Sequence, residues 1–423
     1  MASGGRILLA TAGSLGDLHP FIALGLALKA RGYRPEIASS PDYRAAVEAS
    51  GLGFRAVGPD IPRLERELGM DFAAMTRRIM RSDFFLWDRI VLPYLEEATR
   101  DLLEAGQGAR AVVASTLSSG AAIVCDALDL PRVAVALQPF VIGSAHDPAR
   151  VRQAPWLRPA RGGAQLALNR LTLAIGRRRT RPWDARAAEV RRRLGAPPSA
   201  HRLLWDELAS ADLGLGLFSS VLADRRPDWP ASFQVVGEAA WDRPEAELSP
   251  ELQRFLDGGA PPVVATLGSF AAAAPGDFYA VAAEGARLAG RRLVAVTGER
   301  PATASPEGPH VLATPYAPFS KLFPRAAALV QHAGIGSIQQ GLRAGLPQLL
   351  VPHLGDQFDN AARLERLGGG LVLPRRRFTP EAVAEALGRL PSLQPRAGEL
   401  GRRVAAENGA EAGADRIAVL LDG

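Results

Sequence analysis

The chain reads Val330-Gln331-His332-Ala333-Gly334-Ile335-Gly336-Ser337, and this stretch indicates the fold. A strand-length apolar run ends at a glycine-rich turn, and a helix is expected to begin near Ile335. Glycine lets a backbone approach a ligand closely, and the unpaired amides at a helix N-terminus bind phosphate without a metal ion. Gly336 and Ser337 therefore suit a diphosphate, and His332 can donate a hydrogen bond to the same phosphates.

A second polar pair follows this stretch. Asp356 and Gln357 stand at the expected start of another helix, shortly before Asn360-Ala361. Their carboxylate and amide groups can bind sugar hydroxyls. The sequence thus offers groups for a diphosphate and for a sugar within one half of the chain.

Short apolar strands alternate with helical segments on both sides of this region. The expected strands are Arg6–Ala12, Glu36–Ser39, Phe54–Val57, Ala111–Ser115 and Val133–Ala136 in the first half, and Val263–Leu267, Leu293–Thr297, Ala327–Val330 and Gln348–Val351 in the second. Alternation of this kind predicts an α/β protein with doubly wound parallel sheets. Ligands of such sheets bind beyond the carboxyl ends of the strands, so two such domains facing each other would form a central cleft.

A chain of 423 residues favours two domains, and a proline-rich stretch around Trp241 marks the expected linker. The expected parts are a first domain at 1–235, a linker at 236–260, a second domain at 261–408 and a C-terminal helix at 409–423. Cys125 is the only cysteine, which excludes an intramolecular disulfide and a thiolate zinc cluster. The apolar runs are too short to span a membrane and the N-terminus lacks a signal-peptide pattern, so we expect a cytoplasmic protein.

The formal net charge is +6, and thirteen arginines fall between Arg150 and Arg193. An apolar stretch with helical spacing, Leu166 to Ile175, lies among them. Such a segment can meet anionic lipid or nucleic acid. Acidic residues return at Asp184 and Glu189 and no nucleic-acid motif accompanies the arginines, which favours a solvated helix face. We therefore expect no nucleic-acid partner, and peripheral membrane contact stays open.

Taken together, these motifs resemble the signature of bacterial family 1 glycosyltransferases, H-x-G-x-x-S followed by a D-Q pair. Rhamnolipid-forming and flavonoid rhamnosyltransferases and antibiotic-tailoring glycosyltransferases share it. The resemblance extends to Gly13–Pro20, which reads G-S-x-G-D-x-x-P, to Thr266-Leu267-Gly268-Ser269 and to Pro315-Tyr316-Ala317-Pro318. It implies the GT-B fold, in which an N-terminal Rossmann-like domain binds the acceptor, a C-terminal one binds the nucleotide sugar, and a final helix crosses back to the N-terminal domain.

The resemblance also implies the donor-binding residues. In the family, the serine of the second motif lies near the phosphates and the aromatic residue of the third lies near the base. Gln340 stands where plant-type members carry the glutamate that holds the ribose. The residues expected to bind the donor are Ser14, Gly16, Ser269, Tyr316, His332, Gly334, Gly336, Ser337, Gln340, Asp356 and Gln357. The stretches Tyr316-Ala317-Pro318-Phe319 and Asp356-Gln357-Phe358-Asp359-Asn360 resemble those of rhamnosyltransferase-like members most. This resemblance points to a dTDP-linked donor such as dTDP-rhamnose, with UDP open.

Two residues compete for the role of catalytic base. Asp17 occupies the position at which the family carries its base, and it could also act as a helix N-cap. His19, at the expected helix start, has an intrinsic pKa better suited to accepting a proton near pH 7. The plant-type dyad has an aspartate where this chain reads Ala114-Ser115-Thr116, so a His–Asp dyad is not expected.

Aromatic residues of the first half are candidates for an acceptor pocket. The expected acceptor-binding residues are Phe84, Phe85, Trp87 and Phe140. Aromatic residues at helical spacing often form a core instead, and we expect this for about half of such positions. The acceptor would be a hydroxylated apolar molecule, such as a flavonoid, another polyphenol or a lipid.

The sequence therefore predicts an inverting, metal-independent glycosyltransferase that uses no cofactor besides its nucleotide-sugar co-substrate and exists as a monomer or weak dimer. Gly13 to Gly16 lack the G-x-G-x-x-G spacing of a dehydrogenase, and no D-x-D pair suggests a bound cation. Two alternatives remain: a non-catalytic relative that binds a nucleotide sugar, and a nucleotide-sugar epimerase of the same architecture.

Overall fold

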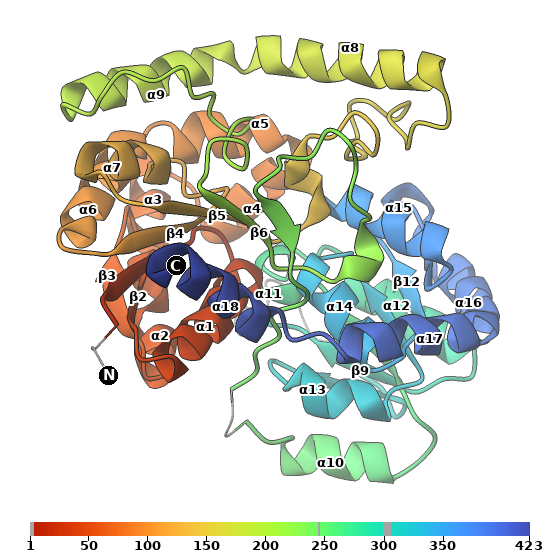
Figure 1. Ribbon diagram of the computed structural model, residues 1–423. Coiled ribbons are helices and arrows are strands. Elements are labelled where there is room, and N and C mark those ends of the chain that lie inside the picture. The colour runs from red at the N-terminus through yellow and green to blue at the C-terminus, as the bar shows by residue number, and fades with distance from the viewer. Residues whose placement is uncertain (1–3, 244–245, 299–305) are drawn as a thin grey trace. The chain divides into compact units, whose positions relative to one another are not determined.

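The computed structural model describes residues 4–243, 246–298 and 306–423 (Figure 1). The chain forms two compact units. The first unit contains the residues up to Met70, Ser82–Trp241 and Asn408–Gly423, and the second contains Asp71–Arg81 and the residues from Asp242 to Glu407.

These units differ from the expected domain bounds in two places. Helix α4 (Phe72–Arg81) belongs to the second unit, although its sequence position lies within 1–235. Phe72 of this helix contacts Phe270 edge to face at 5.8 Å between ring centroids, and Met75 and Ile79 are buried. Helix α10 (Pro250–Asp257) occupies part of the expected linker. Local sequence shows that a helix is amphipathic but does not show which core it covers.

The first unit contains a parallel sheet of seven strands in the order β3-β2-β1-β4-β5-β6-β7. Its strands are β1 (Arg6–Ala10), β2 (Arg34–Ser39), β3 (Gly53–Ala56), β4 (Ala111–Ser115), β5 (Arg132–Ala136), β6 (Leu213–Gly216) and β7 (Phe233–Val235). Its α-helices are α1 (Leu15–Ala30), α2 (Arg44–Ala49), α3 (Ile61–Leu68), α5 (Asp83–Leu86), α6 (Leu95–Gly106), α7 (Ala121–Leu128), α8 (Gly163–Arg179), α9 (Arg181–Arg193) and α18 (Gly409–Asp422).

The second unit contains a parallel sheet of six strands in the order β10-β9-β8-β11-β12-β13. Its strands are β8 (Val263–Thr266), β9 (Leu293–Val296), β10 (Val311–Thr314), β11 (Ala328–Gln331), β12 (Gln348–Leu350) and β13 (Gly370–Val372). Its other α-helices are α11 (Gly268–Ala271), α12 (Phe278–Leu288), α13 (Phe319–Leu322), α14 (Ile335–Arg343), α15 (Gln357–Leu367), α16 (Pro380–Arg389) and α17 (Gln394–Ala405). No helix in the described ranges is both long and apolar enough to span a membrane.

The predicted fold class, an α/β protein with doubly wound parallel sheets, is confirmed. Helices cover both faces of the first sheet, so its central strands are apolar throughout rather than alternating. Ile7 and Leu9 of β1 pack in one core with α1 and α18, whereas Leu8 and Ala10 pack in another with α6 and α7. Because each strand serves two cores, both sides must be apolar.

The sequence did not indicate strands β6, β7, β10 and β13. Strand β6 reads Leu-Gly-Leu-Gly, and glycine is depleted in strands. A Cβ on Gly214 would stand 2.9 Å from Cδ2 of Phe233, so the glycine is there to admit the neighbouring aromatic ring. That requirement comes from β7, which is distant in the sequence.

The final helix closes the core of the first unit. Ala414 and Ile417 of α18 are fully buried in the core that α1 also lines. Arg31, which follows α1, bonds the carboxylates of Glu411 and Asp415 at 2.7 and 2.5 Å. The helix expected at Gly409 to Leu421 therefore packs on the first unit, although it follows the second in the sequence.

Candidate active site

The glycine-rich loop of the second unit lies at the point where the strand order of its parallel sheet reverses. Strands β8 and β11 are hydrogen-bonded neighbours at the centre of the sheet, and each continues outward to strands on its own side. Ligands of doubly wound sheets bind beyond the carboxyl ends of such strands. Helix α11, which follows β8, carries Ser269, and the loop after β11 carries His332. Both predicted donor elements thus reach the same edge of this sheet.

Helix α14 offers free amides at this edge. Gly334 is its N-cap, and the first-turn amides of Ile335, Gly336 and Ser337 have no partner within the helix. Apart from its two chain neighbours and the nearby backbone of α14, no atom of the described residues lies within 4 Å of the point where a Cβ on Gly336 would stand. A diphosphate can therefore approach the helix start without meeting a side chain.

Two amide side chains hold the turn in shape. Ala333 has a φ of +68°, a left-handed conformation that is unfavourable for a residue with a Cβ. Its N–H donates to Oε1 of Gln331 at 3.1 Å, and its carbonyl accepts from Nδ2 of Asn360 at 3.2 Å. Gln331 also donates to Gln348 of β12 at 2.7 Å. Sequence reasoning missed the role of Gln348, because its contact with the turn depends on the pairing of β11 with β12.

His332 is packed between two glycines. A Cβ on Gly334 would stand 2.4 Å from its Nε2, and a Cβ on Gly268 would stand 2.9 Å from its Cε1. Gly268 also has a φ of +63°. The ring is buried, and Nδ1 lacks a well-formed hydrogen bond. Burial and, to a smaller extent, the nearby His353 lower the pKa of His332 to about 3, so the imidazole is neutral near pH 7 and can donate one N–H to an anion.

The remaining predicted donor residues lie in different surroundings. Asp356 is the N-cap residue of α15, and its Oδ2 accepts from Asn360 at 2.7 Å. The side-chain oxygen of Gln357 accepts from the backbone amides of His353 and Leu354, which leaves its NH₂ group as the group that can donate to a ligand. Ser269 is exposed, Gln340 is half-buried, and Tyr316 is 40% exposed with the guanidinium of Arg243 above its ring.

Asp17 lies in a compact loop at the carboxyl end of β1 in the first unit. Ser14 caps α1 and accepts a hydrogen bond from the amide of Gly16 at 3.2 Å. Asp17 stands in the first turn, and its Oδ2 accepts from both the amide and the hydroxyl of Ser14 at 2.7 and 3.2 Å. The pair forms a capping box, so Asp17 supports the helix start from within the first turn rather than as the N-cap. The helix begins at Leu15, earlier than the expected start at His19.

The Asp17 carboxylate is poised to accept a proton. Burial raises its pKa to about 6, and the hydrogen bonds from Ser14 oppose part of that rise. Both hydrogen bonds go to Oδ2, and none of the described residues donates a hydrogen bond to Oδ1. A Cβ on Gly13 would stand 2.3 Å from Oδ2, and Gly13 has a φ of +125°. Glycine at this position therefore admits the carboxylate.

His19 and Tyr43 also surround this loop. The imidazole of His19 contacts Trp241 edge to face at 4.8 Å between ring centroids. The hydroxyl of Tyr43 donates to the carbonyl of Gly13 at 2.9 Å and thereby fixes the loop that carries Asp17. Sequence reasoning missed Tyr43 and Trp241 as neighbours of this loop, because neither belongs to the motif around Asp17.

Two of the predicted acceptor aromatics belong to a hydrophobic core. Trp87 is buried and stacks on Trp183 of α9 at 4.9 Å, and Phe84 contacts the same indole at 5.5 Å. Both pack in one hydrophobic cluster with Trp183. Phe85 and Phe140 are half-buried outside this cluster.

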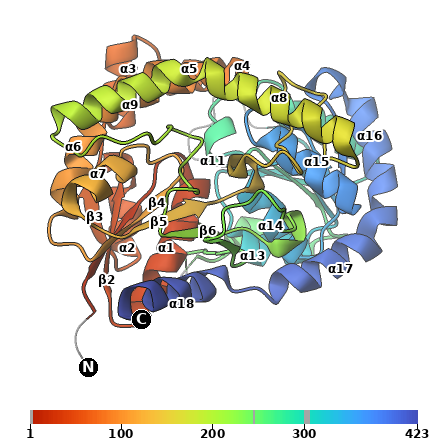
Figure 2. The same ribbon diagram turned by 45° about the horizontal axis from the view of Figure 1, so that its top comes forward.

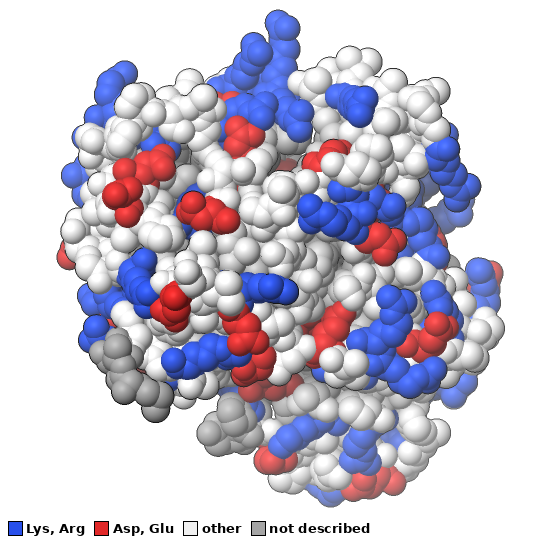
Figure 3. All heavy atoms as spheres, in the orientation of Figure 1, with Lys and Arg blue, Asp and Glu red and all other residues white. Residues whose placement is uncertain are grey.

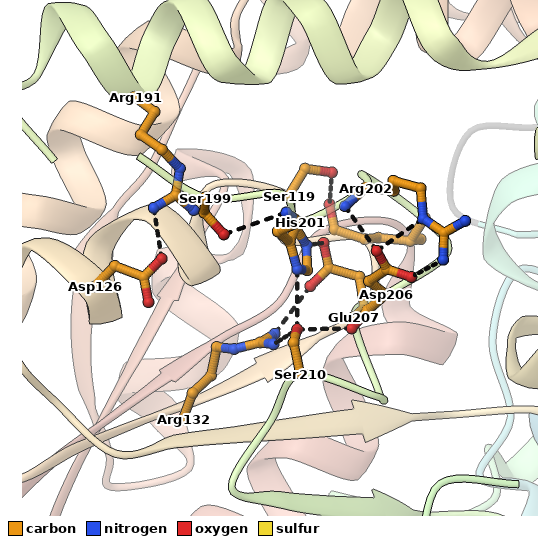
Figure 4. Close-up of polar contacts among 11 residues, drawn as sticks. Ser119, Asp126, Arg132, Arg191, Ser199, His201, Arg202, Asp206, Glu207 and Ser210 are labelled. Carbon is orange, nitrogen blue, oxygen red and sulfur yellow. Dashed lines mark hydrogen bonds and ion pairs between the residues drawn. The ribbon is translucent and has the colours of Figure 1, made fainter. Parts of the chain in front are cut away.

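A small cavity of about 290 Å³ lies in the first unit beside α9. Figure 4 shows the ion pairs and hydrogen bonds around it. Arg132 pairs with Glu207 at 3.0 Å, and both side chains are almost fully buried. His201 uses Nδ1 for Ser210 and Nε2 for Glu207 at 2.9 and 3.0 Å, so both ring nitrogens are engaged within the fold. This network of ion pairs and hydrogen bonds stabilises the fold beside the cavity and is distinct from the Asp17 loop.

Comparisons with known proteins match both units. Residues 7–142 match the glycosyltransferase family 28 N-terminal domain, and residues 293–421 match the C-terminal domain of erythromycin biosynthesis protein CIII-like proteins. O-mycaminosyltylonolide 6-deoxyallosyltransferase from Streptomyces fradiae is 34% identical over 434 residues, which cover 96% of this chain and 95% of that protein.

Solved structures confirm the GT-B fold that the sequence predicted. The kitacinnamycin glycotransferase has a TM-score of 0.72 at 21% identity and covers 99% of both chains. The glycosyltransferase VinC, solved in complex with dTDP, has a TM-score of 0.70 at 20% identity and also covers 99% of both chains. With a relative of 34% identity along nearly the whole chain, the protein belongs to the glycosyltransferases that join a family 28 N-terminal domain to an erythromycin CIII-like C-terminal domain.

Proposed function

We propose that this glycosyltransferase moves a 6-deoxyhexose such as rhamnose from a dTDP-linked donor to a hydroxyl of an apolar natural product, with inversion and without a metal ion. The observation that carries the proposal is the presence of one half-site in each unit at the carboxyl edge of its sheet. The first unit supplies a carboxylate with an elevated pKa, Asp17, and the second supplies unpaired amides and a neutral imidazole, His332.

The donor diphosphate would bind at the start of α14. The first-turn amides and the N–H of His332 would meet its oxygens, with Gly336 leaving room for them. The same donors would stabilise the charge that develops on the leaving diphosphate. Ser14 and Gly16 of the first unit, and Ser269, Tyr316, Gln340, Asp356 and Gln357 of the second, would complete donor recognition. The dTDP bound to the similar VinC structure, and the 6-deoxyallosyl group in the name of the Streptomyces fradiae relative, favour dTDP over UDP and a 6-deoxyhexose.

Asp17 would act as the base. Its Oδ1 would take the proton of the acceptor hydroxyl while the acceptor oxygen forms a bond to the anomeric carbon. The bond from that carbon to the diphosphate breaks with its electron pair on the leaving oxygen, and a single displacement inverts the anomeric centre. A pKa of about 6 makes Asp17 a stronger base than an ordinary aspartate, yet leaves it ionised at about pH 7.5. His19 remains the alternative base.

The acceptor would bind in the first unit. Phe85 and Phe140 remain candidates for its pocket. Phe84 and Trp87 pack on Trp183 and would support the pocket wall without contacting the acceptor. The name of the Streptomyces fradiae relative gives its acceptor as O-mycaminosyltylonolide, which favours a large hydroxylated natural product over a flavonoid or lipid.

The test is product mass and nucleoside diphosphate release over a matrix of dTDP- and UDP-sugars against macrolide aglycones, flavonoids, sterols and hydroxy fatty acids. We expect a product heavier by one deoxysugar, formed equally with chelator present. Asp17→Asn should lower turnover by about 10²- to 10⁴-fold. If His19→Ala lost turnover while Asp17→Asn kept it, His19 would be the base. Donor binding without product from any acceptor would favour a non-catalytic relative, and an altered free nucleotide sugar would indicate an epimerase.

A further inference from the structure

One face of α8 is apolar and open to solvent. Leu168, Leu171 and Ile175 are 41%, 60% and 60% exposed. Three alanines continue the same stripe at helical spacing, and all are exposed: Ala164, Ala167 and Ala174. In Figures 1 and 2, α8 lies at the edge of the first unit, and no other element of that unit lies beyond it. Large contiguous apolar patches of this kind mark interaction sites.

The helix cannot turn this face inward. On its opposite side, Asn169 is fully buried and donates through Nδ2 to the carbonyls of Ala145 and Arg158, both at 2.9 Å. Gln165 donates to Oδ1 of the same Asn169 at 2.8 Å. Hydrogen bonds from Asn169 and the half-buried Leu166 and Leu173 thus hold the inner side of the helix, and the outer apolar side stays exposed.

An indole extends the apolar face. Trp156 is 50% exposed, and its Nε1 donates to Oγ1 of Thr172 on α8 at 3.1 Å. This bond holds the ring beside the helix. Amphipathic rings of this kind are favoured at the boundary between lipid and water.

Arginines surround the patch without acidic residues among them. Residues 148–183 contain nine arginines and neither Asp nor Glu. Arg161, Arg170, Arg178 and Arg181 are exposed and form no ion pair with any described residue. Figure 3 shows basic side chains projecting beyond white atoms along the upper edge, where Figure 1 draws α8 and α9.

We propose that the outer face of α8, with Trp156 and these arginines, docks the enzyme on an anionic lipid surface, with α8 parallel to the membrane plane. An apolar stripe inserts between acyl chains while flanking arginines meet lipid phosphates. A second copy of the chain fits less well, because self-pairing would bring the two arginine-rich rims together. Nucleic acid would satisfy the arginines but would leave the leucines and isoleucine without an apolar partner. The inference does not depend on sugar transfer.

Vesicle cosedimentation of the full chain tests the proposal. We expect binding to phosphatidylcholine–phosphatidylglycerol vesicles, little binding to phosphatidylcholine alone, and weaker binding at high salt. The double variants Leu171→Glu/Ile175→Glu and Arg170→Glu/Arg178→Glu should each lower the binding by about tenfold or more. Val419→Glu is the matched control, since Val419 is an isolated apolar residue of α18 that is 66% exposed.

Each contrary result is informative. Equal binding of the wild type and both double variants, or no binding of the wild type to anionic vesicles, would overturn the proposal. A wild-type dimer in light scattering that Leu171→Glu/Ile175→Glu converts to a monomer would assign the face to a second copy instead. Because all four positions are exposed, circular dichroism should show that the variants stay folded.

Discussion

Replacing Asp17 by asparagine should abolish most activity and yet stabilise the first unit. Burial raises the pKa of Asp17 from 3.8 to about 6, so ionising this carboxyl in the folded protein is unfavourable by about two pKa units. At about 1.4 kcal/mol for each unit, the folded state carries a cost of about 3 kcal/mol once Asp17 is charged. Asparagine avoids that cost, and its amide oxygen can still accept the hydrogen bond from the Ser14 amide.

The pH dependence follows from the two pKa values. In the unfolded chain Asp17 ionises near 3.8, whereas in the folded protein it ionises near 6. The wild type therefore loses stability relative to Asp17→Asn as the pH rises from about 4 to about 6, and the full difference of up to about 3 kcal/mol persists above that range. Below about pH 4 both chains carry a neutral group at this position, and their stabilities should converge.

Denaturant unfolding monitored by tryptophan fluorescence is the appropriate assay, because all six tryptophans of the chain lie in the first unit. Asp206→Asn is the matched control. Burial pushes the pKa of Asp206 upward, but hydrogen bonds from Arg202 outweigh it and hold that pKa below its ordinary value. Asp206→Asn should therefore destabilise the unit, most strongly at neutral pH. A lower stability of Asp17→Asn at about pH 8, or a difference that does not change with pH, would refute the reasoning.

Three further predictions concern the second unit. Gly334→Ala should weaken dTDP binding by about ten- to hundredfold in titration calorimetry, because its Cβ would stand 2.4 Å from Nε2 of His332 and overpacking costs about 1–3 kcal/mol. Asn360→Ala should weaken it by about tenfold, since the left-handed turn at Ala333 loses a hydrogen bond worth about 1–2 kcal/mol. Arg363→Met should cost about 3–5 kcal/mol in scanning calorimetry, because it removes the cation of a buried ion pair; a cost below about 1 kcal/mol would contradict that account.

The sequence predicted those parts of the fold and site that depend on short stretches. The proposed phosphate-binding loop consists of a strand end, glycines and a helix start within a few residues, so the sequence alone predicts the region around His332. The sequence does not predict the hydrogen bonds that hold that loop. Gln348 reaches Gln331 only through strand pairing, and Asn360 reaches Ala333 from the next helix. Helix α4 shows the same limit, since its apolar face does not reveal which core it joins.

The Asp17 loop shows why a structural and a chemical role were difficult to separate in the sequence. A carboxylate in the first turn of a helix is expected for capping alone, and Asp17 does form a capping box with Ser14. The capping box uses only Oδ2, however, and the pKa of Asp17 is raised by burial in the folded loop, which Tyr43 holds through its hydrogen bond to Gly13. A helix cap needs neither an elevated pKa nor an oxygen left without a donor, whereas both properties make a carboxylate a better base. The two properties that distinguish a base from a cap therefore depend on tertiary structure, and the titration of Asp17→Asn against the wild type measures the first of them directly.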